Sequence, residues 1–189
     1  MTLEVITGPM FSGKSTELIR AVKREGYAKK KIGVFKPSID SRYSEDNVVT
    51  HDGLKYPTFV IPINDDGIKL IYDIVKRENF DVIGVDEIQF FPTSIIDVIE
   101  KLADEKIKVI VTGLNLNFRG EPFEIMSTIL PRADNIIHLS AVCATCGGRG
   151  TRTQRIVNGK PARYDTPVIV VGGQEMYEAR CREHHEVIR

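Results

Sequence analysis

Hydrophobic residues along this chain fall into short continuous runs that are separated by segments with helical spacing. Runs rich in Val and Ile occupy residues 3–7, 31–35, 80–85 and 107–111, and a last strand is expected near 135–139. Continuous runs of this length are typical of strands that are buried on both faces of a parallel sheet. The pattern therefore predicts a buried, mainly parallel sheet.

The segments between these runs are predicted to be helices. Residues 14–27 are compatible with a helix, and residues 66–78 and 93–105 place apolar side chains at helical spacing. The two apolar stripes consist of Ile68, Ile71, Ile74 and Val75 and of Ile95, Ile96, Ile99 and Leu102. Alternating strands and helices indicate an α/β fold with right-handed crossovers.

Two stretches depart from this alternation. Residues 37–57 are polar and rich in turn formers, which predicts one long loop, and loops of that length are usually functional or disordered. From Ala141 onward the chain has no helical period and carries clustered Cys and Gly residues. We therefore predict two domains, residues 1–139 and residues 140–189.

Composition narrows the function classes. Lys and Arg number 26, as do Asp and Glu, so the net charge is zero, whereas a general nucleic-acid coater needs a basic surface. No apolar run reaches the roughly 18 residues of a membrane span, and the N-terminus lacks the pattern of a signal peptide. Three cysteines are an odd number for a disulfide scaffold. We expect a cytoplasmic protein that binds neither nucleic acid nor membrane.

The strongest motif lies near the N-terminus. Residues 8–15, GPMFSGKS, match G-x-x-x-x-G-K-S/T between a predicted strand and a predicted helix. Glycines in such a loop let successive backbone N–H groups point at phosphate oxygens, and the helix adds its positive end. A chance glycine turn is the alternative, and the flanking elements argue against it. The predicted ATP site is Gly8, Pro9, Met10, Phe11, Ser12, Gly13, Lys14 and Ser15, with Lys14 on the β- and γ-phosphates and Ser15 on Mg²⁺.

Two carboxylates follow the apolar run 80–85. Ligands in open α/β sheets bind outside the carboxyl ends of the strands, beside the phosphate loop. Asp86 is the expected Mg²⁺ partner through water, because Mg²⁺ dehydrates reluctantly. Glu87 is then available as a general base. Without the phosphate loop, Glu87 could be an ordinary solvated carboxylate at a strand end.

A second motif contains all three cysteines. Cys143 and Cys146 form one pair with two intervening residues, and Cys181 and His184 form another, which is the spacing of zinc ligands. A Cys₃His set closes a tetrahedral shell, so the metal would be structural. His185 competes with His184, which we prefer for its symmetric spacing; buried or redox-active cysteines are the alternative. Zinc would clamp the base of a long loop over 147–180 that can fold over a ligand.

Together these motifs resemble those of the type II thymidine kinases, the compact class found in bacteria and in animal cytosol. The matching stretches occur in order over nearly the whole chain: GPMFSGKST (8–16), DSRYS (40–44), DEIQFF (86–91), LNLNFRGEPF (114–123), CATC (143–146), VIVVGG with Tyr177 (168–177) and CREHH (181–185). Many NTPases share the phosphate loop, but its combination with DE-x-Q-F and a zinc-clamped loop is highly specific. Animal members carry Cys where this chain has His184.

The resemblance implies a P-loop NTPase-type α/β fold with a small zinc-binding lasso domain, and ATP-dependent phosphorylation of thymidine or deoxyuridine to give dTMP. It also implies a homotetramer that dTTP inhibits as end product. Asp40 and Arg42 would approach the phosphates and Mg²⁺, and Asp86 and Gln89 would border that site, with Glu87 as proton acceptor. The thymine pocket would be formed by Met10, Phe90, Leu114, Phe118 and Phe123, closed by Thr153, Val168, Ile169, Val170, Val171, Gly172 and Tyr177.

Several of these residues could instead have a purely structural role. Phe118 and Phe123 could be core aromatics, Tyr177 a half-buried phenol, and Arg42 a solvated side chain. Two other functions stay open on sequence grounds. One is a different P-loop small-molecule kinase or ATPase. The other is a nucleic-acid-binding module, which the zero net charge and the absence of Trp disfavour.

Overall fold

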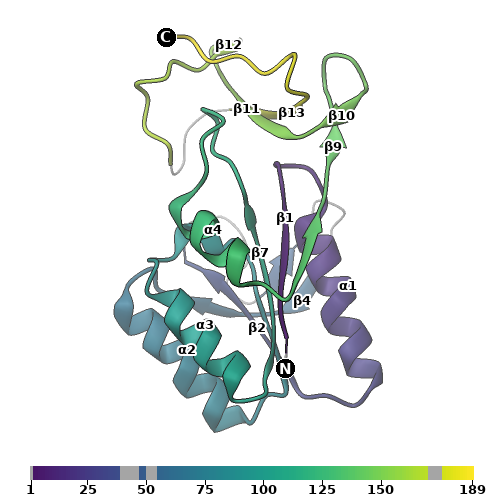
Figure 1. Cartoon of the computed structure of the whole chain (residues 1–189), viewed down its shortest axis with the longest axis vertical. Helices are drawn as coiled ribbons and strands as arrows, with labels where there is room; N and C mark the ends of the chain where they lie inside the picture. Colours follow the sequence, from purple (N-terminus) through teal and green to yellow (C-terminus); the bar gives the residue numbers. More distant parts are fainter. Residues whose placement is uncertain (1, 39–46, 50–54, 170–175) are drawn as a thin grey trace.

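The computed structural model describes residues 2–38, 47–49, 55–169 and 176–189. Its centre is a six-stranded sheet in which every pair of neighbouring strands is parallel (Figure 1). The strands, in spatial order, are β5 (Phe59–Ile61), β2 (Ile32–Pro37), β6 (Val82–Val85), β7 (Lys108–Leu114), β1 (Leu3–Gly8) and β8 (Asn135–His138). The predicted parallel α/β sheet is therefore confirmed.

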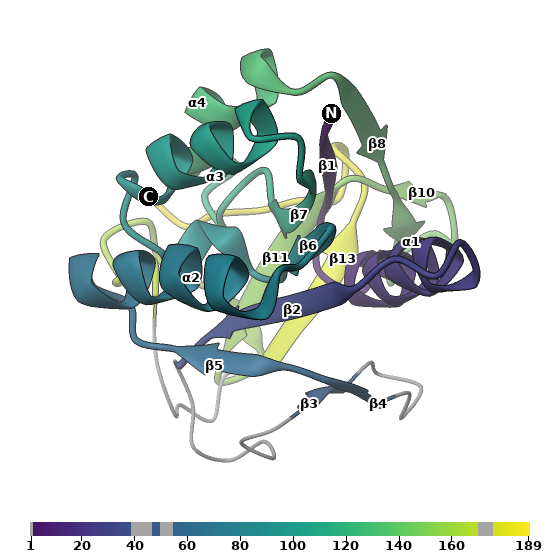
Figure 2. The same cartoon turned by 90° about the horizontal axis from the view of Figure 1, so that it is seen from below.

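Helices cover both faces of this sheet (Figure 2). Helix α1 (Lys14–Tyr27) lies on one face, while α2 (Asp65–Glu78), α3 (Ile95–Asp104) and the short α4 (Glu124–Ile129) lie on the other. Successive side chains of a strand point to opposite faces. Accordingly Ile110 of β7 packs with the α1 cluster, and its neighbours Val109 and Val111 pack with the other. The central strands are buried on both faces, which explains why they appear as continuous apolar runs.

The predicted helices are present with slightly different ends. Helix α2 begins one residue earlier than expected, because the Asn64 side chain accepts a hydrogen bond from the Gly67 N–H at 2.9 Å. Asn79 ends the helix in the left-handed conformation. No helix among the described residues is both long enough and apolar enough to cross a bilayer.

Several short elements were not predicted. Residues 37–57 are not one continuous loop, because β3 (Asn47–Val49) pairs antiparallel with β4 (Lys55–Pro57). The edge strand β5 was also missed, as were α4 and the 3₁₀ turns η1 (Ile88–Phe90) and η2 (Leu130–Arg132). Three- to six-residue elements are too short for hydrophobic periodicity to reveal.

The segment after β8 forms small antiparallel sheets, which we call the C-terminal unit, residues 140–189. One sheet pairs β9 (Ala141–Val142) with β10 (Arg149–Gly150). The other has the order β12 (Lys160–Pro161), β11 (Arg152–Val157), β13 (Met176–Arg180). Residues 147–180 are therefore not one continuous loop, because they contain β10 to β13. The polar side chains of β11 hid its strand character. In Figure 1 this unit lies above the carboxyl ends of β1 and β7.

Candidate active site

The phosphate loop connects β1 to α1. Gly8 is required there, because a Cβ atom on it would lie 2.6 Å from the Leu139 carbonyl oxygen. Gly13 adopts the left-handed conformation with φ of 81° and precedes the first helical residue, Lys14. The Lys14 ammonium and the Ser12 hydroxyl both donate to the Pro9 carbonyl at 2.8 Å. The loop is therefore closed by its own side chains.

Lys14 is buried, at 6% exposure. Burial lowers the pKa of Lys14, and the carboxylates of Glu87 and Asp86 oppose that shift. The three groups therefore lie close enough to interact electrostatically. The phosphate loop and the carboxylates after β6 form one charged cluster at the carboxyl edge of the sheet.

Asp86 follows the last residue of β6 and is held by β7. The buried Thr112 hydroxyl donates to Asp86 Oδ1, which also accepts from the Glu87 N–H at 3.0 Å. Glu87 adopts a left-handed backbone conformation, with φ of 52°. A non-glycine residue in this conformation stores strain, and such strain persists where surrounding contacts hold it.

The Glu87 carboxylate is half-buried and points to a defined partner. The Gln89 amide donates to it, and the other end of the Gln89 amide accepts from the Leu114 N–H at 3.1 Å. Burial raises the pKa of Glu87, and the neighbouring Asp86 carboxylate adds to the rise, while Lys14 and Gln89 oppose it. A carboxylate with a raised pKa has a proton affinity suited to a general base.

A cavity of about 620 Å³ opens beside this cluster. It brings together fourteen of the residues predicted for the site: Met10, Phe11, Gly13, Lys14, Ser15, Glu87, Phe90, Leu114, Phe118, Phe123, Thr153, Val168, Ile169 and Tyr177. Gly8, Pro9, Ser12, Asp86 and Gln89 do not line it and lie behind it in the loop and the carboxylate network. Asp40, Arg42, Val170, Val171 and Gly172 lie outside the described residues.

Three lining residues were not predicted: Thr16, Leu116 and Asn117. Thr16 directly follows Ser15 in the first turn of α1, so the phosphate-loop motif could have suggested it. Asn117 is buried, and its side-chain oxygen accepts from the backbone N–H groups of Arg119 and Glu121. It thereby fixes the turn after Leu116. Only the position of that turn against the cavity identifies these residues.

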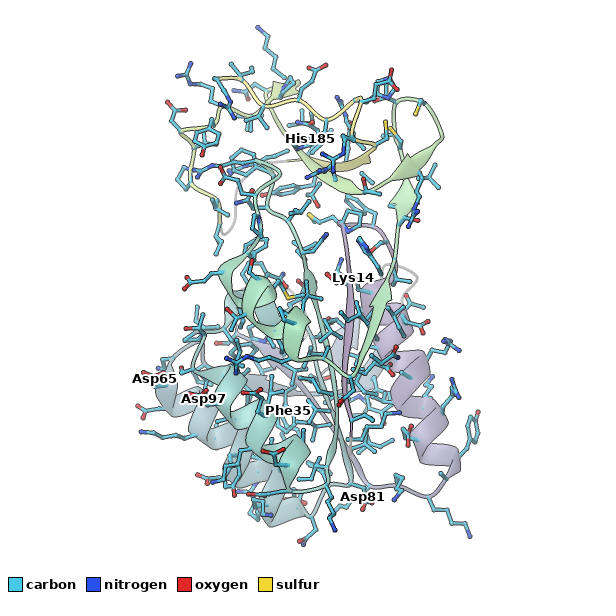
Figure 3. All side chains as sticks on the ribbon, in the orientation of Figure 1. Lys14, Phe35, Asp65, Asp81, Asp97 and His185 are labelled. Atoms are coloured by element: carbon cyan, nitrogen blue, oxygen red, sulfur yellow. The ribbon has the colours of Figure 1, made fainter. Side chains whose placement is uncertain are left out.

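The C-terminal unit closes one side of the cavity. Thr153 of β11 is buried, and its hydroxyl accepts from the Met10 N–H of the phosphate loop at 3.0 Å. Two residues further along β11, the buried Arg155 guanidinium stacks on the Phe118 ring, 5.1 Å from its centroid. Figure 3 shows the labelled Lys14 below this unit, in which His185 is labelled. The cavity therefore lies between two parts of the chain that are far apart in sequence.

Cys143, Cys146, Cys181 and His184 converge in the C-terminal unit, with all ligand atoms within 4.8 Å of one another. The Cys146 and Cys181 sulfurs are 4.0 Å apart, and His184 Nδ1 lies 3.1 Å from Cys181 Sγ. Zinc–sulfur bonds of about 2.3 Å give a tetrahedron with edges of about 3.8 Å, so the cluster fits zinc. His185 is not in this group, because its Nε2 lies 2.8 Å from the Phe118 carbonyl oxygen.

The cysteines are also suited to a metal ion by charge. Burial works against ionisation of the Cys143 thiol, but backbone contacts with Cys181, Cys146 and Thr145 outweigh it and lower its pKa to about 6. The thiolate is the form that binds a metal. The unit therefore holds a Cys₃His cluster that can bind a metal ion and leaves no open position for chemistry.

Comparison with known proteins agrees with this geometry. The family model described as TK: Thymidine kinase matches residues 1–185. A thymidine kinase of Thermococcus kodakarensis is 56% identical over 185 residues, which are 98% of this chain and 94% of the relative. A thymidine kinase of Pyrobaculum aerophilum is 51% identical over 185 residues, 98% of each chain.

A solved structure shares the fold at much lower identity. The crystal structure of the flagellar accessory protein FlaH from Methanocaldococcus jannaschii has a TM-score of 0.50 and 14% identity, covering 85% of this chain and 74% of that one. This likeness concerns the fold alone. The family assignment depends instead on the family model and the two relatives, which extend over nearly the full length. This chain belongs to the thymidine kinase family.

Proposed function

We propose that the protein transfers the γ-phosphoryl group of ATP to the 5′-hydroxyl of thymidine, and of deoxyuridine, to give the nucleoside monophosphate. The observation that carries the proposal is the composition of one cavity. Lys14 and Ser15 of the phosphate loop line this cavity. The Glu87 carboxylate and the rings of Phe90, Phe118 and Phe123 line it as well. A charged phosphate region thus adjoins an aromatic region of a size suited to a small ligand.

In the phosphate region, backbone N–H groups of residues 8–15 and the start of α1 would bind the ATP phosphates. The Lys14 ammonium would exchange its Pro9 carbonyl for phosphate oxygens. Mg²⁺, held by Ser15 and by Asp86 with water in between, would neutralise charge on the transferring group. Asp40 and Arg42 are assigned to the same phosphates by resemblance alone.

The transfer itself is an in-line displacement. The 5′-oxygen forms a bond to the γ-phosphorus as the bond to the bridging oxygen of ADP breaks, and the hydroxyl proton passes to the Glu87 carboxylate. Gln89 orients that carboxylate through its hydrogen bond, because its own amide is fixed at Leu114. Positioning and charge stabilisation should account for most of the rate enhancement.

In the aromatic region, the rings of Phe90, Phe118 and Phe123 would enclose the pyrimidine with Met10 and Leu114. Thr153, Val168, Ile169 and Tyr177 would close the pocket from the C-terminal unit. Backbone groups of Val170, Val171 and Gly172 are assigned to base recognition by resemblance. Exclusion of water by this closure would prevent ATP hydrolysis.

The remaining assignments complete the proposal. Zn²⁺ would occupy the Cys143, Cys146, Cys181 and His184 cluster as a structural ion, so residues 140–189 would form a metal-dependent domain beside residues 1–139. By resemblance, the protein would be a cytoplasmic homotetramer inhibited by dTTP. Cys143, Cys146 and Cys181 form no disulfide, which suits a reducing compartment.

Transfer of label from γ-labelled ATP to a panel of nucleosides tests the proposal. Labelled product with thymidine and deoxyuridine alone is the expected result. ATP hydrolysis without any nucleoside, or transfer to another acceptor, would instead identify a different P-loop ATPase or kinase. A salt-dependent shift of nucleic acid in a gel would favour the binding module.

A further inference from the structure

His185 and His184 are adjacent in sequence but have different partners. His184 Nδ1 lies 3.1 Å from Cys181 Sγ and belongs to the Cys₃His cluster. His185 Nε2 lies 2.8 Å from the Phe118 carbonyl oxygen. Since a carbonyl oxygen only accepts, Nε2 carries the proton and donates.

The partner of His185, Phe118, lines the cavity together with Thr153 of β11. Phe118 comes from the loop after β7 and Thr153 from β11, and the two residues are brought together only in the folded chain. Thr153 also accepts from the Met10 N–H of the phosphate loop. The imidazole therefore contacts one of these two segments, and the next residue, Glu186, is hydrogen-bonded to the other through Gln154 of β11.

The position of His185 is fixed by the segments on either side of it. The side chain of the fully buried Gln154 accepts from the Glu186 N–H at 2.8 Å and donates to the Glu186 carbonyl at 2.9 Å. On the other side, a Cβ atom on Gly120 would lie 3.5 Å from His185 Cε1. The imidazole is therefore held between β11 and the turn that carries Phe118. In Figure 3 His185 is labelled within the C-terminal unit, above Lys14.

We propose that His185 is a positioning residue that couples the folded metal cluster to the nucleoside pocket by holding the backbone of Phe118 next to β11. This inference rests on the proposed function for the identity of the pocket. When the metal ion orders residues 181–184, the next residue is placed where its Nε2–H meets the Phe118 carbonyl. Loss of that donor would leave the carbonyl without its partner and free the Phe118 ring to shift.

The expected kinetic effect is selective. The Phe118 ring and Thr153 belong to the nucleoside side of the cavity, whereas residues 8–15 bind the ATP phosphates. Weakening the support from His185 should therefore raise the thymidine KM more than the ATP KM. A general loss of stability would instead reduce the amount of active enzyme, which lowers the apparent kcat and leaves both KM values unchanged.

The test compares His185→Asn with His185→Gln. Both amides donate, but only glutamine is long enough to place its N–H near the position of the imidazole Nε2–H. We expect His185→Asn to raise the thymidine KM and the calorimetric Kd about tenfold, a change of about 1.4 kcal/mol. The ATP KM and the zinc content should stay as in the wild type. His185→Gln should restore most of the thymidine affinity, and Glu183→Gln, at an exposed neighbouring position, should behave as the wild type.

Hydrogen exchange by mass spectrometry supplies a readout that does not depend on activity. In zinc-loaded His185→Asn, amides of segments 115–123 and 150–156 should exchange faster, while those of segment 8–16 exchange at the wild-type rate. Unchanged exchange in both segments together with an unchanged thymidine Kd would overturn the proposal, as would loss of zinc from His185→Asn. If the wild type bound no thymidine, the proposed function would fail, and the exchange comparison would still decide whether His185 holds these two segments.

Discussion

The body of the molecule, residues 1–139, and the C-terminal unit are built from different kinds of side chain. All four residues of β6 are buried, and the strands of the body contribute to apolar clusters on both faces of the sheet. In the described part of the C-terminal unit, the buried apolar residues are only Cys143, Ile156, Ala162 and Ala179. Buried polar residues occur beside them in β11, namely Thr153, Gln154 and Arg155.

The difference shows that the two regions are held together by different forces. Burial of apolar surface contributes about 25 cal/mol per Å², and the body has many fully buried Ile and Val side chains to supply it. A unit of roughly 50 residues with few such side chains is marginal without a metal ion or disulfides. We therefore expect the C-terminal unit to depend on its metal ion and on contacts with the body.

Removing one metal ligand should have the largest effect. Structural zinc contributes about 10–16 kcal/mol of binding free energy that is coupled to folding. Cys146→Ser should therefore lose zinc and unfold residues 140–189. If that region stays folded, the thymidine KM should rise at least about tenfold. Metal analysis, limited proteolysis and thymidine kinetics measure these outcomes.

Thr145→Ser is the matched control, since residue 145 is exposed between the two ligands of the first pair. It should retain zinc and wild-type kinetics. A zinc-free Cys146→Ser protein with unchanged thymidine kinetics would refute the role of the metal in the pocket.

Changing Glu87 should affect the chemical step and leave the C-terminal unit intact. General-base catalysis contributes about 10²–10⁴-fold, so Glu87→Gln should lower kcat by at least about tenfold while ATP still binds. The amide keeps the size of the side chain and removes the proton acceptor. Rapid-quench measurement of product formation tests the effect, and a wild-type kcat would exclude Glu87 as the base.

The stability of the same variant separates catalysis from folding. Burial raises the pKa of Glu87 in the folded protein. Stability from this group is therefore present at low pH and is lost as the pH rises through the folded-state pKa. At neutral pH the ionised carboxylate costs folding free energy, so Glu87→Gln should have a Tm equal to or above that of the wild type. A lower Tm would mean that misfolding contributes to its loss of kcat.

A core substitution should show the opposite pattern, with lower stability and intact zinc. Ile110 of β7 is fully buried in the cluster under α1. Ile110→Ala should reduce the free energy of unfolding of the body by about 2–5 kcal/mol, as for other large-to-small core changes. Denaturant unfolding and metal analysis measure the two properties. Leu70→Ala, at an exposed helical position, is the control, and loss of zinc from Ile110→Ala would show that the two regions unfold together.

The smallest expected effect is a shift in pH dependence. Because the pKa of Glu87 is raised, kcat should fall on the acid side at a higher pH than for an ordinary glutamate. Gln89 stabilises the ionised carboxylate, so Gln89→Met should move this acid limb upward by about one pH unit. The pH profile of kcat measures it. A downward shift, or an unchanged acid limb in Glu87→Gln, would assign the limb to another group.

Much of the body was predictable because its signals are local. The phosphate loop is eight consecutive residues. The strands β1, β6 and β7 are buried on both faces, so each appears as a continuous apolar run and not as the alternating pattern of a surface strand. The two ligand pairs were visible for the same reason, since each pair spans four residues. Elements without such signals, such as the three-residue β5 and the polar β11, were missed.

The sequence by itself determined the parallel α/β fold, the phosphate loop, the carboxylates after β6 and the family. Only the tertiary structure decided which distant residues meet: the Met10 N–H with the Thr153 hydroxyl, Thr112 with Asp86, and His185 with Phe118 rather than with the cysteines. Spacing along a chain reports contacts within one helix or strand, because those repeat every few residues. Contacts between segments more than twenty residues apart depend on how sheets and turns pack, and no local pattern encodes that packing.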